Sequence, residues 1–361
     1  MQKVALILAG GYGSRLWPFS TESNPKQFSH FFGEGSMLVN TYQRILNFFD
    51  KQNIFVISQS IFYDKIKEQL PDLSNENIIL EPYLRSTSAA ITYANLYLQY
   101  AYTDNFILNV FPSDHLISNL SEFSNSLEIA QEAAESLKAI LTLGIIPTYP
   151  ETQFGYINID DTIKMPGFFE KNVRFVKNFA EKPDKGTAER FIQSGDFVWN
   201  SGIFVFLSDV LWKELQINLP EFYKLFNDLK LSFGSPYFAR KLDHTYRSLP
   251  TISFDNGILE KSKNVFCVLS NFEWSDLESW DEVYRQAKKD IHNNFVNGEV
   301  INLQTEGVYI LAKDRLVATI GVSDLIIVET EKATLICKRG ETEKVKKIID
   351  YLRSKGIKDY L

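Results

Sequence analysis

The chain has 361 residues, more than one typical domain and fewer than three. It is 45% hydrophobic and 23% charged, as expected for a globular protein. Its net charge of −7 argues against nonspecific nucleic-acid binding, which requires a basic face. An anionic substrate would therefore need a local group of cations. Cys267 and Cys337 lie outside any CxxC pair, so we expect two reduced core residues rather than zinc ligands or a disulfide.

The start of the chain leads directly into a predicted strand and carries no signal-peptide pattern. No apolar run approaches the roughly 18 residues that a membrane span requires. We therefore expect a cytoplasmic protein with neither membrane nor nucleic-acid partners.

Short apolar runs alternate with helical patterns over the first part of the chain. The predicted strands are 4–8, 53–58, 78–80, 106–111 and 139–144, and the predicted helices are 37–49, 61–70, 86–100 and 120–138. Ser86 is the expected N-cap of the third helix. This alternation indicates a parallel sheet in a three-layer α/β fold, which binds ligands beyond the carboxyl ends of its strands.

A polar segment at residues 288–294 marks the predicted boundary between a catalytic domain, 1–290, and a C-terminal module, 295–361. Closely spaced strands are predicted at 298–303, 307–312, 316–320, 325–329 and 333–337, followed by an amphipathic helix at 341–354. Such spacing suggests a small β module with a few turns of a β-helix. Its apolar strands could form a homodimer interface.

The segment LAGGYGSRLWPFSTESNPKQF, residues 8–28, is the most informative part of the chain. Glycines 10, 11 and 13 follow the first strand, where they permit a sharp turn and a close approach of the backbone. Arg15 and Lys26 add positive charge, and the combination predicts a polyphosphate site. The Walker pattern is absent, and Leu16 replaces the third glycine of the dinucleotide fingerprint, which argues against a Rossmann dehydrogenase.

Two acidic residues follow apolar segments elsewhere in the chain. Asp114 comes just after the predicted strand 106–111, in FPSDH, and Asp276 lies in FEWSDLESW. Asp114 also fits an ordinary Pro-Ser-Asp turn. Because Mg²⁺ prefers one or two carboxylates together with phosphate oxygens, these acids are also candidate metal ligands.

GGxGxRLWPxSxxxxPKQF resembles the signature of sugar-1-phosphate nucleotidyltransferases, most of all the mannose-1-phosphate guanylyltransferase branch. The resemblance implies a three-layer, Rossmann-like mixed sheet with a small C-terminal β-helix-like module. It also implies Mg²⁺-dependent transfer of GMP from GTP to α-D-mannose 1-phosphate. The catalytic residues that it implies are Arg15, Lys26, Asp114, Lys182 and Asp276, with Mg²⁺ on Asp114 and Asp276.

Further motifs support this resemblance. They are EPYLR at 81–85, GIIPTYPETQFGYI at 144–157, AEKP at 180–183, WNSGIF at 199–204 and SFDNGILEKS at 253–262. The implied nucleotide-binding residues are Leu8, Ala9, Gly10, Gly11, Gly13, Ser14, Glu81, Arg85 and Ser113, with Glu81 as a candidate reader of the base. The implied sugar-binding residues are Gly155, Tyr156, Glu181, Asn200, Gly202, Asp255 and Glu260.

The sequence also departs from the family pattern. Ser86 replaces an asparagine, Gln153 a glycine, Asn256-Gly257 a Tyr-Ala pair, and Glu278 the glycine of WSDVGSW. These differences leave two alternatives open. One is the same reaction on another sugar 1-phosphate, such as a heptose or fucose, and the other is a catalytically silent regulator that binds a GDP-sugar.

Overall fold

The structure is a computed structural model and describes residues 1–102 and 104–361. The chain divides into two compact units, each described by itself below. Unit 1 comprises Met1–Gly10, Thr41–Ser113 and Ile117–Trp274. Unit 2 comprises Gly11–Asn40, Asp114–Leu116 and Ser275–Leu361.

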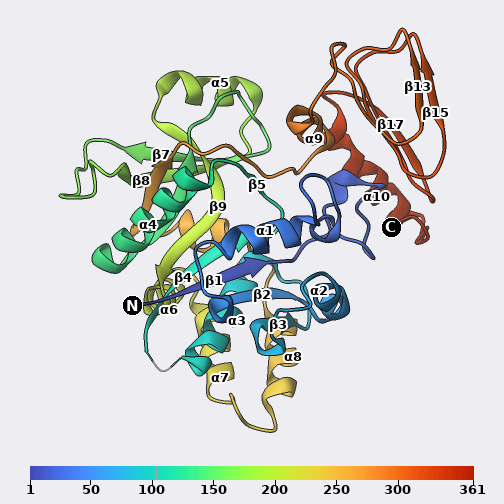
Figure 1. Cartoon of the computed structure of the whole chain (residues 1–361). Helices are drawn as coiled ribbons and strands as arrows, with labels where there is room; N and C mark the ends of the chain where they lie inside the picture. The colour runs from blue at the N-terminus through green and yellow to red at the C-terminus, as the bar shows by residue number, and fades with distance from the viewer. Residues whose placement is uncertain (103) are drawn as a thin grey trace. The chain divides into compact units, whose positions relative to one another are not determined.

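Unit 1 is built on a nine-stranded sheet of order β3-β2-β1-β4-β9-β6-β10-β8-β7 (Figure 1). The strands are β1 (Gln2–Leu8), β2 (Ile54–Gln59), β3 (Ile78–Glu81), β4 (Phe106–Pro112), β6 (Ile140–Ile145), β7 (Gly155–Asp160), β8 (Val173–Glu181), β9 (Phe197–Leu207) and β10 (Val265–Ser270). The first four strands are parallel, as the alternation predicted, but β9 runs antiparallel between β4 and β6. The sheet is therefore mixed, which agrees with the family resemblance.

Helices cover the sheet of unit 1. They are α2 (Tyr63–Gln69), α3 (Ser86–Ala101), α4 (Leu120–Leu137), α5 (Lys185–Ser194), α6 (Ser208–Asn218), α7 (Pro220–Lys230) and α8 (Phe238–Ser248). Helix α3 packs on β1, β2, β3, α6 and α7, whereas α4 packs on β6, β9 and β10. The middle of β1, from Val4 to Ile7, is fully buried, as expected for a strand covered on both faces.

Two predictions about helix ends were wrong. Ser86 does not cap α3: the capping position is Arg85, and Ser86 has φ 68°, in the left-handed region rather than the extended conformation of an N-cap. The helix predicted to run to residue 49, α1 (Met37–Ile45), ends four residues earlier. Helix α4, by contrast, has a side-chain cap, because Asn119 Oδ1 accepts from Glu122 N at 3.4 Å.

The C-terminal part of unit 2 contains short strands of the β-helix-like kind, drawn in orange and red in Figure 1. The strands are β12 (Phe295–Asn297), β13 (Val300–Leu303), β14 (Tyr309–Ala312), β15 (Val317–Ile320), β16 (Leu325–Glu329) and β17 (Thr334–Lys338). Their pairings are parallel, except that β17 runs antiparallel to β16. The strand predicted at 298–303 begins only at Val300, because Gly298, with φ 101°, forms the turn between β12 and β13. A Cβ there would lie 1.7 Å from Ala312 O, so the turn between β12 and β13 requires glycine.

One hydrophobic core runs through unit 2. Trp280, on α9 (Trp280–Gln286), is fully buried, and its indole Nε1 donates to Trp17 O at 3.0 Å. The same core includes Leu16 from the glycine-loop segment and residues of the C-terminal strands and of α10 (Val345–Ser354). The boundary predicted at residues 290–295 stays a prediction.

Three further observations complete the fold. Strands β5 (Leu116–Ile117) and β11 (Trp274–Ser275) form a separate two-stranded sheet.

Cys267 is buried and Cys337 is only partly buried, and both are free thiols, so Cys337 is not the core residue that was predicted. In the described part of the chain, no helix has both the length and the apolar character needed to cross a membrane.

Candidate active site

The turn of the glycine loop, in unit 2, is held in a shape that requires glycine. Gly11 and Gly13 have φ values of 83° and 62°. A Cβ at Gly13 would lie 2.7 Å from Cγ of Lys26, so the backbone of the loop packs directly on the lysine stem. Gln27 Nε2 donates to Gly11 O at 3.2 Å, and Ser20 Oγ donates to Tyr12 O at 2.5 Å. The segment that carries Lys26 therefore fixes the loop.

The residues that lead into this loop belong to unit 1. Ala9 N donates to Ile57 O at 2.9 Å, and Ser58 Oγ donates to Ala9 O at 2.7 Å. Ser113 N donates to Leu8 O at 3.2 Å, while its buried Oγ has no hydrogen-bond partner among the described residues. Gly10, the last residue of unit 1 before the loop, is exposed. Ser14, in unit 2, is partly buried and begins the short 3-10 helix η1 (Ser14–Leu16).

Unit 2 brings together four of the five predicted catalytic residues. Lys26 Nζ forms an ion pair with Asp114 Oδ2 at 2.8 Å and donates to the backbone oxygen of Asp276 at 3.3 Å. Arg15 forms an ion pair with Glu278, two positions after Asp276. Two cations and three carboxylates thus occupy one small region, and Lys26 is buried within it.

These charges shift one another's pKa values. Burial alone would lower the pKa of Lys26, but Asp114, Asp276 and Glu278 together raise it above its ordinary value. For Asp114, the opposing effect of burial is outweighed by Lys26 and His115, which lower its pKa. Burial, reinforced mainly by Glu278, raises the pKa of Asp276 to about 7. An added positive charge beside Asp276 would favour its ionised form.

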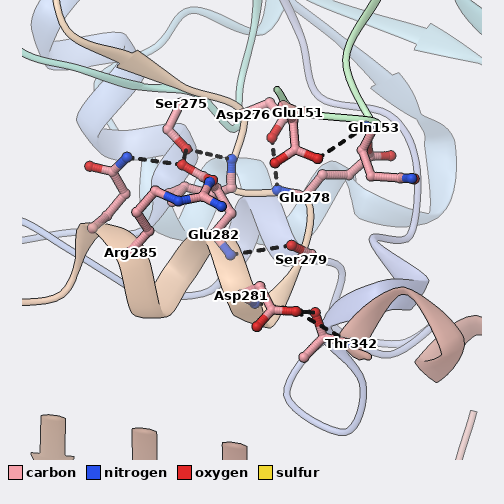
Figure 2. A network of polar contacts seen from close by, with 12 residues as sticks. Glu151, Gln153, Ser275, Asp276, Glu278, Ser279, Asp281, Glu282, Arg285 and Thr342 are labelled. Carbon is pink, nitrogen blue, oxygen red and sulfur yellow. Dashed lines mark hydrogen bonds and ion pairs between the residues drawn. The ribbon is translucent and has the colours of Figure 1, made fainter. Parts of the chain in front are cut away.

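Hydrogen bonds fix the segment that carries Asp276 (Figure 2). Glu278 N donates to Asp276 Oδ1 at 3.0 Å, and Ser275 Oγ donates to Glu282 Oε1 at 2.7 Å. At the start of α9, Ser279 Oγ accepts from Glu282 N at 3.2 Å and so caps the helix. The position of Asp276 thus depends on that of α9.

Helix α9 is in turn tied to the turn that follows β17. The Asp281 carboxylate accepts from Thr342 Oγ1 at 2.6 Å (Figure 2). It also accepts from Gly340 N at 2.8 Å. Asp281 N also donates to Thr342 Oγ1 at 3.2 Å. This hydrogen-bonded connection joins the C-terminal strands of unit 2 to the segment that carries Asp276.

Asp114 and Asp276 are suitable donors for a magnesium ion. In the described residues, no group of three or more His, Cys, Asp or Glu side chains could hold a metal by itself. Two carboxylates completed by water and phosphate oxygens would nevertheless match the usual coordination of Mg²⁺. The raised pKa of Asp276 agrees with this, since a bound divalent cation would offset the repulsion from its acidic neighbours.

Unit 1 holds the predicted sugar-binding residues around Asn200. Asn200 Nδ2 donates to Asp255 Oδ1 at 2.7 Å, and Asn200 Oδ1 accepts from Thr142 Oγ1 at 3.2 Å and from Gly202 N at 3.1 Å. Gly202 has φ 68°, a conformation that favours glycine. Burial raises the pKa of Asp255, although the hydrogen bond from Asn200 opposes the shift. The amide and the carboxyl group therefore form one oriented polar pair.

The remaining predicted sugar-binding residues differ in their exposure. Glu181 and Lys182 are exposed, and Lys182 Nζ lies 3.7 Å from Glu181 Oε1. A Cβ on Gly155 would lie 2.8 Å from Glu181 Oε2. Glu260 is exposed and accepts from Asn256 Nδ2 at 2.7 Å. Tyr156 is fully buried and its hydroxyl donates to Glu151 O at 2.9 Å, so its side chain supports the loop that precedes β7.

Glu81 and Arg85 both contact Tyr246, on α8. Glu81 is 2% exposed and accepts from Tyr246 OH at 3.0 Å, and Arg85 Nε donates to Tyr246 O at 2.7 Å. Burial raises the pKa of Glu81 to about 8, although the bond from Tyr246 opposes the shift. The raised pKa of Glu81 favours the neutral form at pH 7. Its role as reader of the base stays a prediction.

We expect Glu81→Gln to reduce the pH dependence of stability. The carboxyl group is protonated up to about pH 8 in the folded chain but ionises near its ordinary pKa of 4.5 in the unfolded chain. Between these values the unfolded state binds fewer protons, so the free energy of unfolding falls as pH rises. From pH 5 to pH 7, the fall should be about 2–3 kcal/mol larger in wild type than in the variant.

Urea unfolding at pH 5, 6 and 7 measures this difference. Glu132→Gln is the control, because its side chain is 53% exposed and pairs with Lys171 on the surface. If the free energy of unfolding changed equally with pH in wild type and in Glu81→Gln, Glu81 would have an ordinary pKa in the folded chain, and the prediction would be wrong.

Comparison with known proteins identifies the family. A model described as nucleotidyl transferase matches residues 4–293, and one described as MannoseP isomerase/GMP-like beta-helix domain matches residues 298–352. The chain belongs to the nucleotidyl transferase family. This membership confirms the resemblance drawn from the sequence motifs, the predicted fold class and the prediction of an enzyme.

The relatives of this nucleotidyl transferase resemble it over nearly its whole length. Mannose-1-phosphate guanylyltransferase from Escherichia coli is 34% identical over 99% of this chain and 77% of its own length. The protein RfbM of Salmonella typhimurium, with the same activity in its name, is 33% identical over 100% of this chain and 74% of its own. A crystal structure from Thermus thermophilus, described as a mannose-1-phosphate geranyltransferase, has a TM-score of 0.85 at 29% identity and covers 98% of this chain and 100% of its own.

Sequence reasoning missed two contributors to the nucleotidyl transferase site. Gln27 was read as part of a motif, but its side chain holds the Gly11 carbonyl. Glu278 was noted only as a departure from the family pattern, and its ion pair with Arg15 was not foreseen, because 263 positions separate the two residues. The extra acid beside a proposed metal ligand was the available signal.

Proposed function

We propose that this nucleotidyl transferase transfers GMP from GTP to α-D-mannose 1-phosphate, giving GDP-mannose and diphosphate. The observation that carries the proposal is the gathering of Arg15, Lys26, Asp114 and Asp276 in unit 2. The names of the relatives, which match nearly the whole chain, support the choice of base and sugar.

In this proposal, unit 2 binds the triphosphate. Arg15 and the backbone amides of the glycine loop hold phosphate oxygens, and Lys26 neutralises charge near the α- and β-phosphates. Asp114 and Asp276 would hold Mg²⁺, which when bound would supply charge neutralisation at the α-phosphate. Although burial alone would lower the pKa of Lys26, its acidic neighbours raise it and keep the ammonium group protonated. The contacts with Asp114 Oδ2 and Asp276 O fix its direction.

The residues of unit 1 are proposed to bind the sugar phosphate. Lys182 pairs with the phosphate group, while Glu181, Asn200 and Asp255 accept and donate hydrogen bonds at sugar hydroxyls. The second pKa of a phosphate monoester is about 6, so the sugar phosphate is already a nucleophile at neutral pH. No general base is then required, and catalysis depends on positioning and charge.

Diphosphate release tests the proposal across the four NTPs and dTTP, each paired with mannose, glucose, fucose and heptose 1-phosphates. We expect release with GTP and mannose 1-phosphate in the presence of Mg²⁺. Diphosphate release only with another nucleotide and sugar 1-phosphate would show that the enzyme uses those substrates instead. Binding of GDP-mannose without release from any pair would favour the silent regulator.

A further inference from the structure

Arg15 does not face the nucleotide site as an unpaired cation. Its guanidinium forms an ion pair with the Glu278 carboxylate, and the two side chains are only 20% and 31% exposed. Glu278 N also donates to Asp276 Oδ1 at 3.0 Å, so the backbone of Glu278 is anchored to the proposed metal ligand. The ion pair is thus partly shielded from water, and the backbone hydrogen bond to Asp276 fixes the position of Glu278.

Glu278 changes the charge of the whole group. Arg15 and Lys26 lie beside three carboxyl groups, those of Asp114, Asp276 and Glu278. Without Glu278 the group would have one acid fewer and Arg15 would lose its acidic partner. A carboxylate and a phosphate use the same donors of a guanidinium group, so they compete for it.

We propose that Glu278 competes with the phosphates of the nucleotide for Arg15, and so sets both the affinity for GTP and its dependence on a divalent cation. The inference rests on the proposed function, because it takes Arg15 to bind the triphosphate. A free triphosphate must displace Glu278 and overcome the repulsion from its carboxylate. A triphosphate neutralised in part by Mg²⁺ meets less repulsion, so the cation matters more when Glu278 is present.

Calorimetric titration with GTP, in EDTA and in Mg²⁺, tests the proposal on wild type, Glu278→Gln and Glu278→Gly. In EDTA, we expect both variants to bind GTP about fivefold more tightly than wild type, equivalent to about 1 kcal/mol. In Mg²⁺, the difference in GTP affinity between the variants and wild type should be smaller than in EDTA. Glu22→Gln is the matched control, because it removes a carboxylate from an exposed ion pair with Arg353 in the same unit, and its affinity should equal that of wild type.

Equal or weaker GTP binding by Glu278→Gln in EDTA would overturn the proposal. A second measurement is independent of the nucleotide: the rate at which phenylglyoxal modifies Arg15, followed by mass spectrometry of its peptide. The Glu278 carboxylate occupies donors of the guanidinium and shields it from the reagent, so the rate should rise in Glu278→Gln. If wild type binds no GTP even with Mg²⁺, the proposed function fails, and an unchanged rate would show separately that Glu278 does not mask Arg15.

Discussion

Asp276→Asn is expected to lower the turnover number of guanylyl transfer by about 10²–10³ while the protein stays folded. The amide retains an oxygen that can accept from Glu278 N, now 3.0 Å from Asp276 Oδ1, so the segment should keep its conformation. What is lost is one of the two charged donors proposed for Mg²⁺. The variant should therefore also require more Mg²⁺ for half-maximal rate, which a metal titration of diphosphate release would measure.

Two controls separate this effect from a loss of structure. Asp72→Asn removes a carboxylate whose side chain is 86% exposed and should retain wild-type turnover. Thermal unfolding of Asp276→Asn should show no loss of stability, because the substitution removes a partly buried carboxyl group that is repelled by Glu278 and Asp114. A folded variant with near-normal turnover would remove Asp276 from the mechanism.

The identities of the charged residues could be predicted from the sequence, but their pairing could not. The glycine loop and the WSD segment are local patterns whose chemistry follows from residue types at short spacing. The ion pairs Lys26–Asp114 and Arg15–Glu278 join distant parts of the chain. Which acid meets which cation depends on how three separate segments of unit 2 fold together, and no local pattern records that.

In unit 1, the order of the strands and the burial of Glu81 likewise could not be predicted from local sequence patterns. Parallel strands read as continuous apolar runs, so β1 to β4 were found, but β9 gives no sign that it inserts antiparallel beside β4. Glu81 was predicted as a candidate reader of the base, and no local pattern indicated that Tyr246, on α8, would cover it. A charged residue next to a proline usually lies in water, and only the packing of a distant helix reverses that expectation.

Deleting residues 295–361 is expected to unfold unit 2 rather than to release an active catalytic domain. The deletion removes Tyr309, whose ring centroid lies 5.6 Å from that of Trp280, and the buried partners of this core on the later strands and α10. Each large apolar side chain contributes about 1.5–3 kcal/mol through burial, so several such losses approach the whole stability of a domain, about 5–15 kcal/mol. Asp281 would also lose Gly340 and Thr342.

Hydrogen exchange measures the result for each segment. In the truncated protein we expect loss of protection over residues 11–40 and 275–287, and loss of diphosphate release, while the nine-stranded sheet stays protected. Thr342→Val is the graded control: it removes the hydroxyl that donates to Asp281 and should destabilise by about 1 kcal/mol with activity retained. An active truncated protein with normal protection over residues 11–40 would support independent domains at 1–290 and 295–361. The glycine loop would then keep its structure without the C-terminal strands.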